Sequence, residues 1–135
     1  MVKPKPRIVI FALIKEGKIL VEKRPIPGFL DHQYLIPGGA INLKEDLEQA
    51  LKREVLEELG VIPTEFVPLT TEDIVGIFDN NLKPFVITKW KGKIPKIGLD
   101  KEDAYPLEWI EIADALNIPI ESTRKIIEAL KKYLG

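Results

Sequence analysis

Blocks of apolar and polar residues along the chain predict strands, one helix, more strands and a final helix. The apolar and β-branched run at residues 8–14 predicts a buried strand. Residues 16–18 form a turn signal and residues 19–23 resume as a second strand, so the two predict a hairpin. Residues 34–36 predict a short strand that runs into Pro37-Gly38-Gly39, where glycine lets the main chain approach a ligand closely.

The clearest periodic pattern covers residues 46–59 and predicts a helix. An apolar residue recurs at every fourth position, at Leu47, Leu51, Val55 and Leu59. This spacing places the four side chains on one stripe, which would pack against a sheet. Gly60 follows directly and is typical of a helix C-terminus.

The second half of the chain predicts further strands and one more helix. Strands are expected at residues 66–69, 73–78 and 84–91, with a turn at 79–81. Residues 107–112 predict a short strand or the entry to a helical turn at 112–116. Ser122 or Thr123 would cap a last helix that ends near residue 133. This order predicts an α+β or α/β fold, a sandwich with a mixed sheet, in one domain over residues 1–135.

Composition narrows the class of protein. A chain of 135 residues with 45% apolar and 30% charged residues is typical of one soluble globular domain. A net charge of −1 argues against nucleic-acid binding, and the first apolar run is too short to span a membrane. The absence of cysteine excludes disulfides, thiolate metal sites and a cysteine nucleophile, and it favours a cytoplasmic location.

Three carboxylates share one face of the predicted helix. Glu54, Glu57 and Glu58 fall at i, i+3 and i+4, within roughly 100° of one another. On an exposed helix, such like charges repel by a few tenths of a kcal/mol per pair. A solvated acidic face is the usual explanation, but Glu48 and Lys52 show that opposite charges alternate elsewhere on this helix. The pattern therefore favours a hard divalent cation, Mg²⁺ or Mn²⁺, which prefers oxygen ligands.

The neighbouring residues indicate a reaction. Arg53 lies beside this face and could orient a carboxylate or bind phosphate, and Gly38-Gly39 could offer a backbone carbonyl. With no cysteine, no evident Ser–His pair and a single His32, the chemistry left is metal-assisted attack by water. One glutamate could act as the general base. The residues thus predict a hydrolase of phosphate or pyrophosphate bonds.

The same residues match the signature of the Nudix family, G-x5-E-x7-R-E-U-x-E-E-x-G-U, where U is aliphatic. The matching residues are Gly39, Glu45, Arg53, Glu54, Val55, Glu57, Glu58, Gly60 and Val61. The chain therefore resembles Nudix hydrolases over nearly its whole length, although only this box is specific. The resemblance implies an α/β/α sandwich and hydrolysis of a nucleoside diphosphate linked to another group.

The resemblance also implies a role for each residue. The metal ligands would be Gly38, Glu54, Glu57 and Glu58, with Glu54 as a further ligand or as the general base. Arg53 would orient Glu54, and Glu45 would pair with Arg53. In some members the base comes from a late carboxylate instead, for which the candidates are Asp100, Glu102 and Asp103. Asn42 and Lys44 replace a glutamate and a glycine of many members, so we expect the loop conformation to differ more than the chemistry.

Residues outside the box bear on the substrate. Arg24 resembles an arginine that contacts phosphate or base in nucleotide-sanitising members, and Phe78 an aromatic residue of such sites. A surface arginine and a core aromatic are the alternatives. We expect Gly39 and Tyr34 to complete the substrate contacts, beside His32. Ser122 or Thr123 stands where sanitising members read oxidised guanine with asparagine, which argues against strict 8-oxoguanine recognition.

We therefore expect a (deoxy)nucleoside triphosphate pyrophosphatase that releases the nucleoside monophosphate and pyrophosphate. Mg²⁺ would be its cofactor, and Mn²⁺ could substitute. A hydrolase of ADP-ribose or a dinucleoside polyphosphate is the second hypothesis; the proline typical of ADP-ribose-cleaving members is absent from residues 73–78. The third is an idle Nudix domain that senses a ligand, against which the intact box argues. The expected partner is a small nucleotide bound by a monomer or homodimer, not nucleic acid or a membrane.

Overall fold

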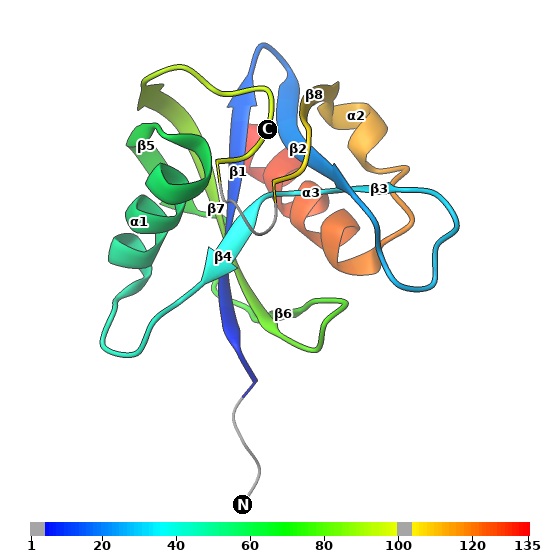
Figure 1. Cartoon of the computed structure of the whole chain (residues 1–135), viewed down its shortest axis with the longest axis horizontal. Helices are drawn as coiled ribbons and strands as arrows, with labels where there is room; N and C mark the ends of the chain where they lie inside the picture. Colours follow the sequence, from blue (N-terminus) through cyan, green and yellow to red (C-terminus); the bar gives the residue numbers. More distant parts are fainter. Residues whose placement is uncertain (1–4, 100–103) are drawn as a thin grey trace, which may run out of the picture.

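A mixed eight-stranded sheet forms the centre of the molecule, and helices flank it (Figure 1). The structure is a computed structural model that describes residues 5–99 and 104–135. In chain order the elements are β1 (Arg7–Lys15), β2 (Lys18–Arg24), β3 (Gln33–Leu35), β4 (Gly38–Ala40), α1 (Leu47–Leu59), β5 (Ile62–Pro68), β6 (Ile74–Val75), β7 (Asn81–Lys91), β8 (Leu107–Glu111), α2 (Ile112–Ala115) and α3 (Glu121–Leu134). None of the helices in these two ranges is long and apolar enough to cross a membrane.

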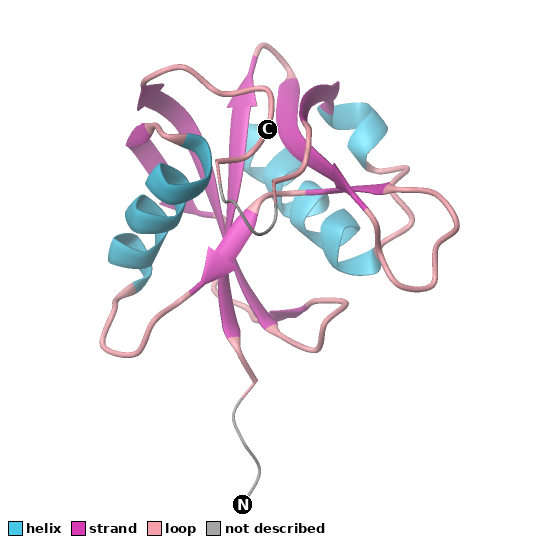
Figure 2. Cartoon of the chain, viewed as in Figure 1, coloured by secondary structure: helices cyan, strands magenta, loops and turns pink. Residues whose placement is uncertain are grey.

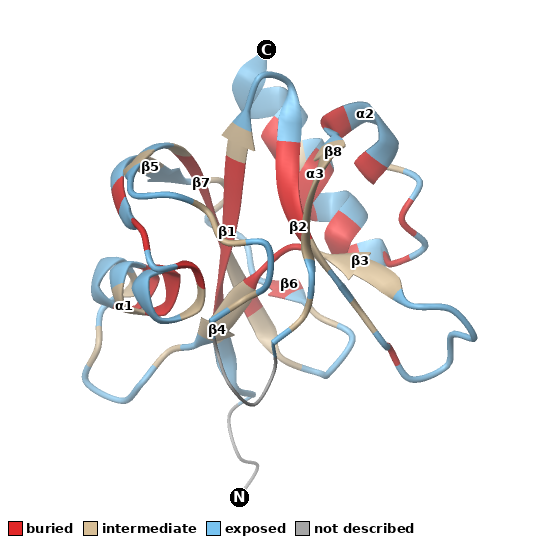
Figure 3. Ribbon diagram, turned by 45° about the horizontal axis from the view of Figure 1, so that its top comes forward, coloured by how far each residue is buried: buried red, intermediate tan, exposed pale blue. Residues whose placement is uncertain are grey.

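Strand β1 separates two apolar cores, because its side chains alternate between the two faces of the sheet. Val9, Phe11 and Leu13 belong to the core that contains residues of α1, whereas Ile10 and Ala12 belong to the core that contains residues of α3. Helices lie on both faces (Figure 2), and the buried residues follow the same layers (Figure 3). The expected α/β/α sandwich with a mixed sheet is confirmed.

Strands β1 and β2 pair only beside their turn, at Ile14–Ile19 and Lys15–Lys18. β2 also pairs with β8, from Lys18 to Glu22, and its last residues, Glu22 to Arg24, pair with β3. The first half of β1 instead pairs antiparallel with β4, and its other edge pairs in parallel with β7. The two strands of the hairpin therefore take different neighbours, and the cavity described below is lined from both of them.

Most of the expected elements are present, and the differences are local. The first hairpin, α1 and the strand at residues 107–111 lie where the pattern predicts them. The pattern does not predict β4, because glycine is depleted in strands. β5 and β7 begin four and three residues earlier than expected, at Ile62 and Asn81. β6 covers only Ile74–Val75, and residues 77–78 of the expected strand form a turn.

The start of α3 differs from the expected capping. The N-cap is Ile120, whose side chain makes no capping hydrogen bond, and Ser122 and Thr123 lie inside the first turn. Ile120 is 2% exposed, so its burial in the core fixes where the helix begins. The prediction that Ser122 or Thr123 caps this helix is wrong, and the two hydroxyls are available for another role.

Candidate active site

Helix α1 is fixed at both ends, and its acidic face is therefore held in one orientation. Asp46 Oδ1 accepts from the N–H of Gln49 at 2.8 Å, and Gln49 Oε1 accepts from the N–H of Asp46 at 3.0 Å. This capping box satisfies two N–H groups at the start of the helix. Gly60 ends it with a left-handed φ of 69°, and its N–H donates to the carbonyl of Leu56 at 2.9 Å.

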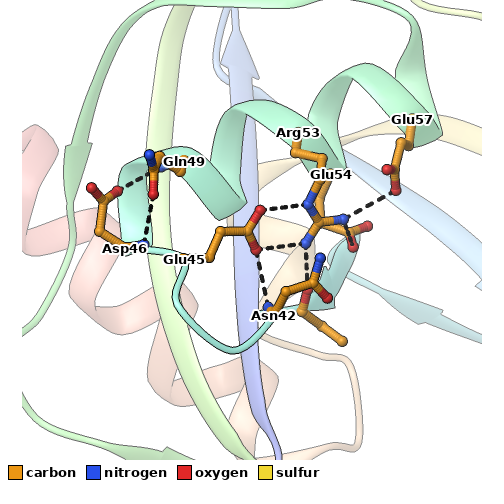
Figure 4. Close-up of polar contacts among 8 residues, drawn as sticks. Asn42, Glu45, Asp46, Gln49, Arg53, Glu54 and Glu57 are labelled. Carbon is orange, nitrogen blue, oxygen red and sulfur yellow. Dashed lines mark hydrogen bonds and ion pairs between the residues drawn. The ribbon is translucent and has the colours of Figure 1, made fainter.

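Arg53 is the positive partner of the acidic face (Figure 4). Its Nε and Nη2 donate to the two carboxylate oxygens of Glu45 at 2.6 and 2.8 Å. Its Nη1 donates to Glu54 at 2.8 Å and to Glu57 at 3.2 Å, and Nη2 also reaches the carbonyl of Ala40 at 2.9 Å. The ion pair between Arg53 and Glu45 that the resemblance implies is therefore present. The single guanidinium of Arg53 thus donates to three carboxylates, those of Glu45, Glu54 and Glu57.

Glu45 ties the loop in front of α1 to the helix. Its hydrogen bonds from Arg53 are the main reason that the pKa of Glu45 falls from 4.5 to about 2, and the N–H of Asn42 lowers it further. The bond to Glu45 also raises the pKa of Arg53 above its ordinary value. In this loop Lys44 takes a φ of 73°, the left-handed conformation that glycine adopts more easily.

Neither glycine of β4 has a positive φ, so the backbone conformation does not require glycine there. The close approach of other atoms does. A Cβ atom on Gly39 would lie 2.0 Å from Oε2 of Glu54, a residue that is only 9% exposed. A Cβ atom on Gly38 would lie 2.6 Å from the carbonyl oxygen of Val9. Both distances are well below van der Waals contact, so glycine allows Glu54 to lie directly on β4.

The carbonyl of Gly38 points to the same side as that of Ala40. In an antiparallel pair, alternate residues bond to the neighbouring strand. Pro37 and Ile41 make these bonds to β1, whereas the carbonyl of Ala40 turns away from β1 and accepts from Arg53. Gly38 is two residues from Ala40 on the same strand, so its carbonyl also turns away from β1.

This set of donors suits a hard divalent cation in its chemistry. The oxygens of Gly38, Glu54, Glu57 and Glu58 are the ligand type that Mg²⁺ prefers. Within the part of the chain that the structure describes, no three His, Cys, Asp or Glu side chains already converge as a metal site. Arg53 holds Glu54 and Glu57 through its own hydrogen bonds. Each carboxylate gives only one oxygen to Arg53, Oε1 of Glu54 and Oε2 of Glu57. Because a carboxylate has two oxygens with several lone pairs, binding of an ion does not require the bonds to Arg53 to break.

A cavity of about 220 Å³ lies beside the two glycines. Its walls are mostly apolar, and Gly38 and Gly39 form part of them. The polar side chains that line it are Glu22, Arg24, Asn80, Ser122 and Thr123. Pockets for drug-sized ligands have volumes of roughly 300–1,000 Å³, so this cavity suits a smaller group such as one nucleobase.

The structure brings three of the four expected substrate contacts together. Arg24, Phe78 and Gly39 line the cavity, and Phe78 is 52% exposed at its edge. Tyr34 does not line it; its hydroxyl bonds to Oε1 of Glu108 at 3.3 Å. His32 is exposed and is also absent from the cavity wall.

Further polar groups line the cavity, and of these the sequence pattern does not predict Glu22. Ser122 and Thr123 are 7% and 3% exposed, and neither hydroxyl bonds to another residue in the described ranges. Oδ1 of Asn80 is buried and likewise has no hydrogen-bond partner there. Glu22 accepts from Nη1 of Arg24 at 3.2 Å. The spacing of Glu22 and Arg24 could have shown this pair, since residues i and i+2 of a strand share a face.

The late carboxylates Asp100, Glu102 and Asp103 lie outside the described residues, so their candidacy as general base stays a prediction. The segment before them contacts the helix of the box. The N–H of Leu99 donates to the carbonyl of Glu58 at 2.8 Å. This bond satisfies one of the carbonyls that the C-terminal end of α1 leaves open.

Comparison with known proteins decides the family. The family model described as the NUDIX domain matches residues 3–130. The chain belongs to the Nudix family. A relative from Buchnera aphidicola subsp. Schizaphis graminum, called 8-oxo-dGTP diphosphatase, is 30% identical over 131 residues, which cover 94% of this chain and 94% of the relative. The protein is a Nudix hydrolase that acts on pyrophosphate bonds, and such hydrolases generally use divalent metal ions.

Solved structures show the same fold. The E. coli ORF135 protein superposes with a TM-score of 0.78 at 21% identity, covering 98% of this chain and 92% of that chain. The NUDIX domain of Shewanella oneidensis NrtR, solved with ADP ribose, gives a TM-score of 0.71 at 21% identity, with coverage of 99% and 91%. At these identities, the likeness concerns the fold alone.

Proposed function

We propose that this Nudix hydrolase is a Mg²⁺-dependent (deoxy)nucleoside triphosphate pyrophosphatase that releases the nucleoside monophosphate and pyrophosphate. The observation that carries the proposal is that Gly39 lines the cavity and also lies against Glu54 of the acidic face. A nucleotide with its base in the cavity would therefore have its phosphates beside α1. The relative called 8-oxo-dGTP diphosphatase supports a nucleoside triphosphate as the substrate class.

In this proposal the acidic face holds the metal and activates water. Gly38, Glu57 and Glu58 would bind Mg²⁺, or Mn²⁺ in its place, with Glu54 as a further ligand or as the general base. The bound ion would offset the negative charge of the pyrophosphate and favour ionisation of water. Arg53 would orient Glu54, because its Nη1 donates to that carboxylate.

Glu45 would act one step farther from the substrate. Its two oxygens accept from Nε and Nη2 of Arg53, which fixes the plane of the guanidinium. We therefore treat Glu45 as the residue that positions Arg53.

The cavity would bind the base and its neighbouring atoms. The half-exposed ring of Phe78 offers a face on which a base can stack. Ser122 and Thr123 offer hydroxyls that both donate and accept. Arg24 adds a cationic donor, and Gly39 lets the ligand pass close to the backbone.

Product analysis tests the reaction. Wild-type protein would be incubated with Mg²⁺ and a panel of the common and oxidised (deoxy)nucleoside triphosphates, ADP-ribose and a diadenosine polyphosphate. Anion-exchange chromatography should show a nucleoside monophosphate and pyrophosphate in equal amounts. Release of a nucleoside diphosphate and orthophosphate would contradict the assigned bond, and faster turnover of ADP-ribose would favour the second hypothesis.

Removal of the metal provides a separate prediction. Excess chelator should abolish turnover, because the carboxylates alone add negative charge where the pyrophosphate binds. Adding back Mg²⁺ or Mn²⁺ should restore it, as followed by pyrophosphate release. Turnover that persists in excess chelator would exclude the metal-dependent mechanism.

A further inference from the structure

The ring of Tyr105 covers the guanidinium of Arg24, the cation of the cavity. The guanidinium carbon lies 4.7 Å from the ring centroid, within the range of a cation–π contact. From another direction, Glu22 accepts from Nη1 of Arg24 at 3.2 Å. The guanidinium is therefore held between a carboxylate and an aromatic face.

Backbone hydrogen bonds fix Tyr105 beside Arg24. The N–H of Gly98 donates to the carbonyl of Tyr105 at 3.1 Å, which joins two antiparallel arms at residues 96–99 and 105–107. The next residue, Pro106, accepts from the N–H of Lys23 at 3.0 Å. Lys23 directly precedes Arg24, so the segment that carries the ring is bonded to the strand that carries the guanidinium.

The other arm is bonded to the helix of the acidic face. The N–H of Leu99 donates to the carbonyl of Glu58 at 2.8 Å, and the side chain of Leu99 lies against Gly60, where a Cβ atom would be 2.9 Å from it. The two arms thus contact both parts of the site, α1 on one side and β2 on the other. The position of Tyr105 is consequently tied to both.

One donor of Arg24 has no partner within the described part of the protein. Its Nε is buried and has no hydrogen-bond partner in residues 5–99 and 104–135. A buried donor without a partner is costly unless a ligand or water meets it. The ring and Glu22 hold the guanidinium group of a residue that lines the cavity wall.

We propose that Tyr105 is a positioning residue for nucleotide binding, which fixes Arg24 in the orientation that meets the substrate. The inference rests on the proposed function for the identity of the ligand. Tyr105 does not line the cavity, so it acts through Arg24. Loss of the Tyr105 ring should weaken nucleotide binding more than it slows the chemical step.

Steady-state kinetics on the triphosphate that wild type hydrolyses best test this. Tyr105→Leu and Tyr105→Met remove the aromatic face and should raise KM about three- to tenfold, with kcat within about twofold of wild type. Tyr105→Phe keeps the ring and should retain the wild-type KM. Phe66→Leu is the matched control: Lys52 lies 5.5 Å from the ring of Phe66, which lines no part of the cavity, and its KM should not change.

A double-mutant cycle shows whether Tyr105 acts through Arg24. Arg24→Met should raise KM at least as much as Tyr105→Leu, and the double variant should be no worse than Arg24→Met alone. If the KM of the double variant rose by the product of the two single effects, the inference would be overturned, because the two residues would then act independently. It would also be overturned if Tyr105→Phe matched Tyr105→Leu, since the hydroxyl rather than the ring would then matter.

Failure of the inference is distinguishable from failure of the proposed function. If wild type hydrolyses triphosphates and Tyr105→Leu keeps the wild-type KM, the inference is wrong and the function stands. If wild type hydrolyses ADP-ribose instead, the function is wrong and the same comparison on ADP-ribose tests Tyr105. Urea unfolding of the four proteins of the cycle tests the contact between Tyr105 and Arg24 without any substrate. Non-additive changes in the free energy of unfolding support the contact, and additive changes overturn it.

Discussion

At the scale of single residues, Arg53 explains how three carboxylates can lie together before any metal binds. Its guanidinium donates to Glu45, Glu54 and Glu57, and the bidentate pair with Glu45 fixes its plane. The repulsion expected along the helix face is therefore partly offset within the protein. A bound divalent cation would offset this repulsion further, and the proposed reaction requires such an ion.

Substitution of Glu57 tests the metal role. Glu57→Gln should lower kcat by roughly 10²–10⁴-fold, the range for a group that stabilises charge or assists proton transfer. The Glu57 side chain is 57% exposed, so the free energy of unfolding should change by less than about 0.5 kcal/mol. Glu48→Gln is the matched control, because Glu48 lies on the same helix and pairs with Lys52 at 3.2 Å. Wild-type turnover in Glu57→Gln would rule out the assignment.

Gly39 tests the close approach of Glu54 to β4. Gly39→Ala would place a methyl group 2.0 Å from Oε2 of Glu54, so the carboxylate must move. We expect kcat to fall at least about tenfold, with a stability loss of about 1–3 kcal/mol from overpacking. Initial-rate assays measure the change in kcat, and urea unfolding measures the change in the free energy of unfolding. If Glu54→Gln alone is as inactive as the double variant, the glycine acts through Glu54; full activity in Gly39→Ala would contradict the geometry.

At the scale of elements, the helix of the box is predictable because its signals are local. The stripe of Leu47, Leu51 and Val55, the cap at Asp46 and the stop at Gly60 all lie within one segment, and the helix forms there. The carboxylate cluster follows from the same spacing. What the segment does not show is the approach of β4, because strand pairing with β1 depends on residues far along the chain.

The bond between Glu45 and Arg53 joins the loop to α1 and should make stability depend on pH. The pKa of Glu45 is lowered from 4.5 to about 2 in the folded protein, mainly by Arg53. A lowered pKa stabilises the folded state fully above about pH 4.5, and this contribution is lost as the pH falls towards about 2. Arg53 stays charged in the folded and unfolded states over this pH range, so it does not make the stability depend on pH.

The measurement is urea unfolding of wild type and Glu45→Gln across that range. The difference in unfolding free energy should be constant above about pH 4.5 and should shrink as the pH approaches 2. Glu48→Gln controls for the general effect of removing a carboxylate from this part of the chain. A difference that stays constant down to pH 2 would show that Glu45 is not held ionised by Arg53.

At the scale of the whole molecule, the cavity collects residues that the sequence separates widely. Its lining runs from Ile8 on β1 to Ile126 on α3, with Arg24 from β2 and Phe78 from the turn before β7. Periodicity identified these elements, but it carries no information on which of them meet. The register between β1 and β7 and the burial of Ile120 decide that, and both are tertiary effects. For this reason the pattern alone predicts the box but not the substrate side of the site, where Arg24 and Phe78 were expected only from the family resemblance.

The hydroxyls of α3 provide the test of this long-range assembly. Thr123→Val keeps the side-chain volume and removes the hydroxyl of a residue that is 3% exposed and lines the cavity. This hydroxyl has no hydrogen-bond partner among the described residues. If that hydroxyl bonds the base, KM for the nucleoside triphosphate should rise about two- to tenfold, as expected for one neutral hydrogen bond, while kcat changes little. Ser122→Ala should behave alike.

Thr64→Val changes an exposed threonine of β5 outside the cavity. It is the control and should leave KM unchanged. An unchanged KM in both α3 variants would mean that the base does not reach this end of the cavity.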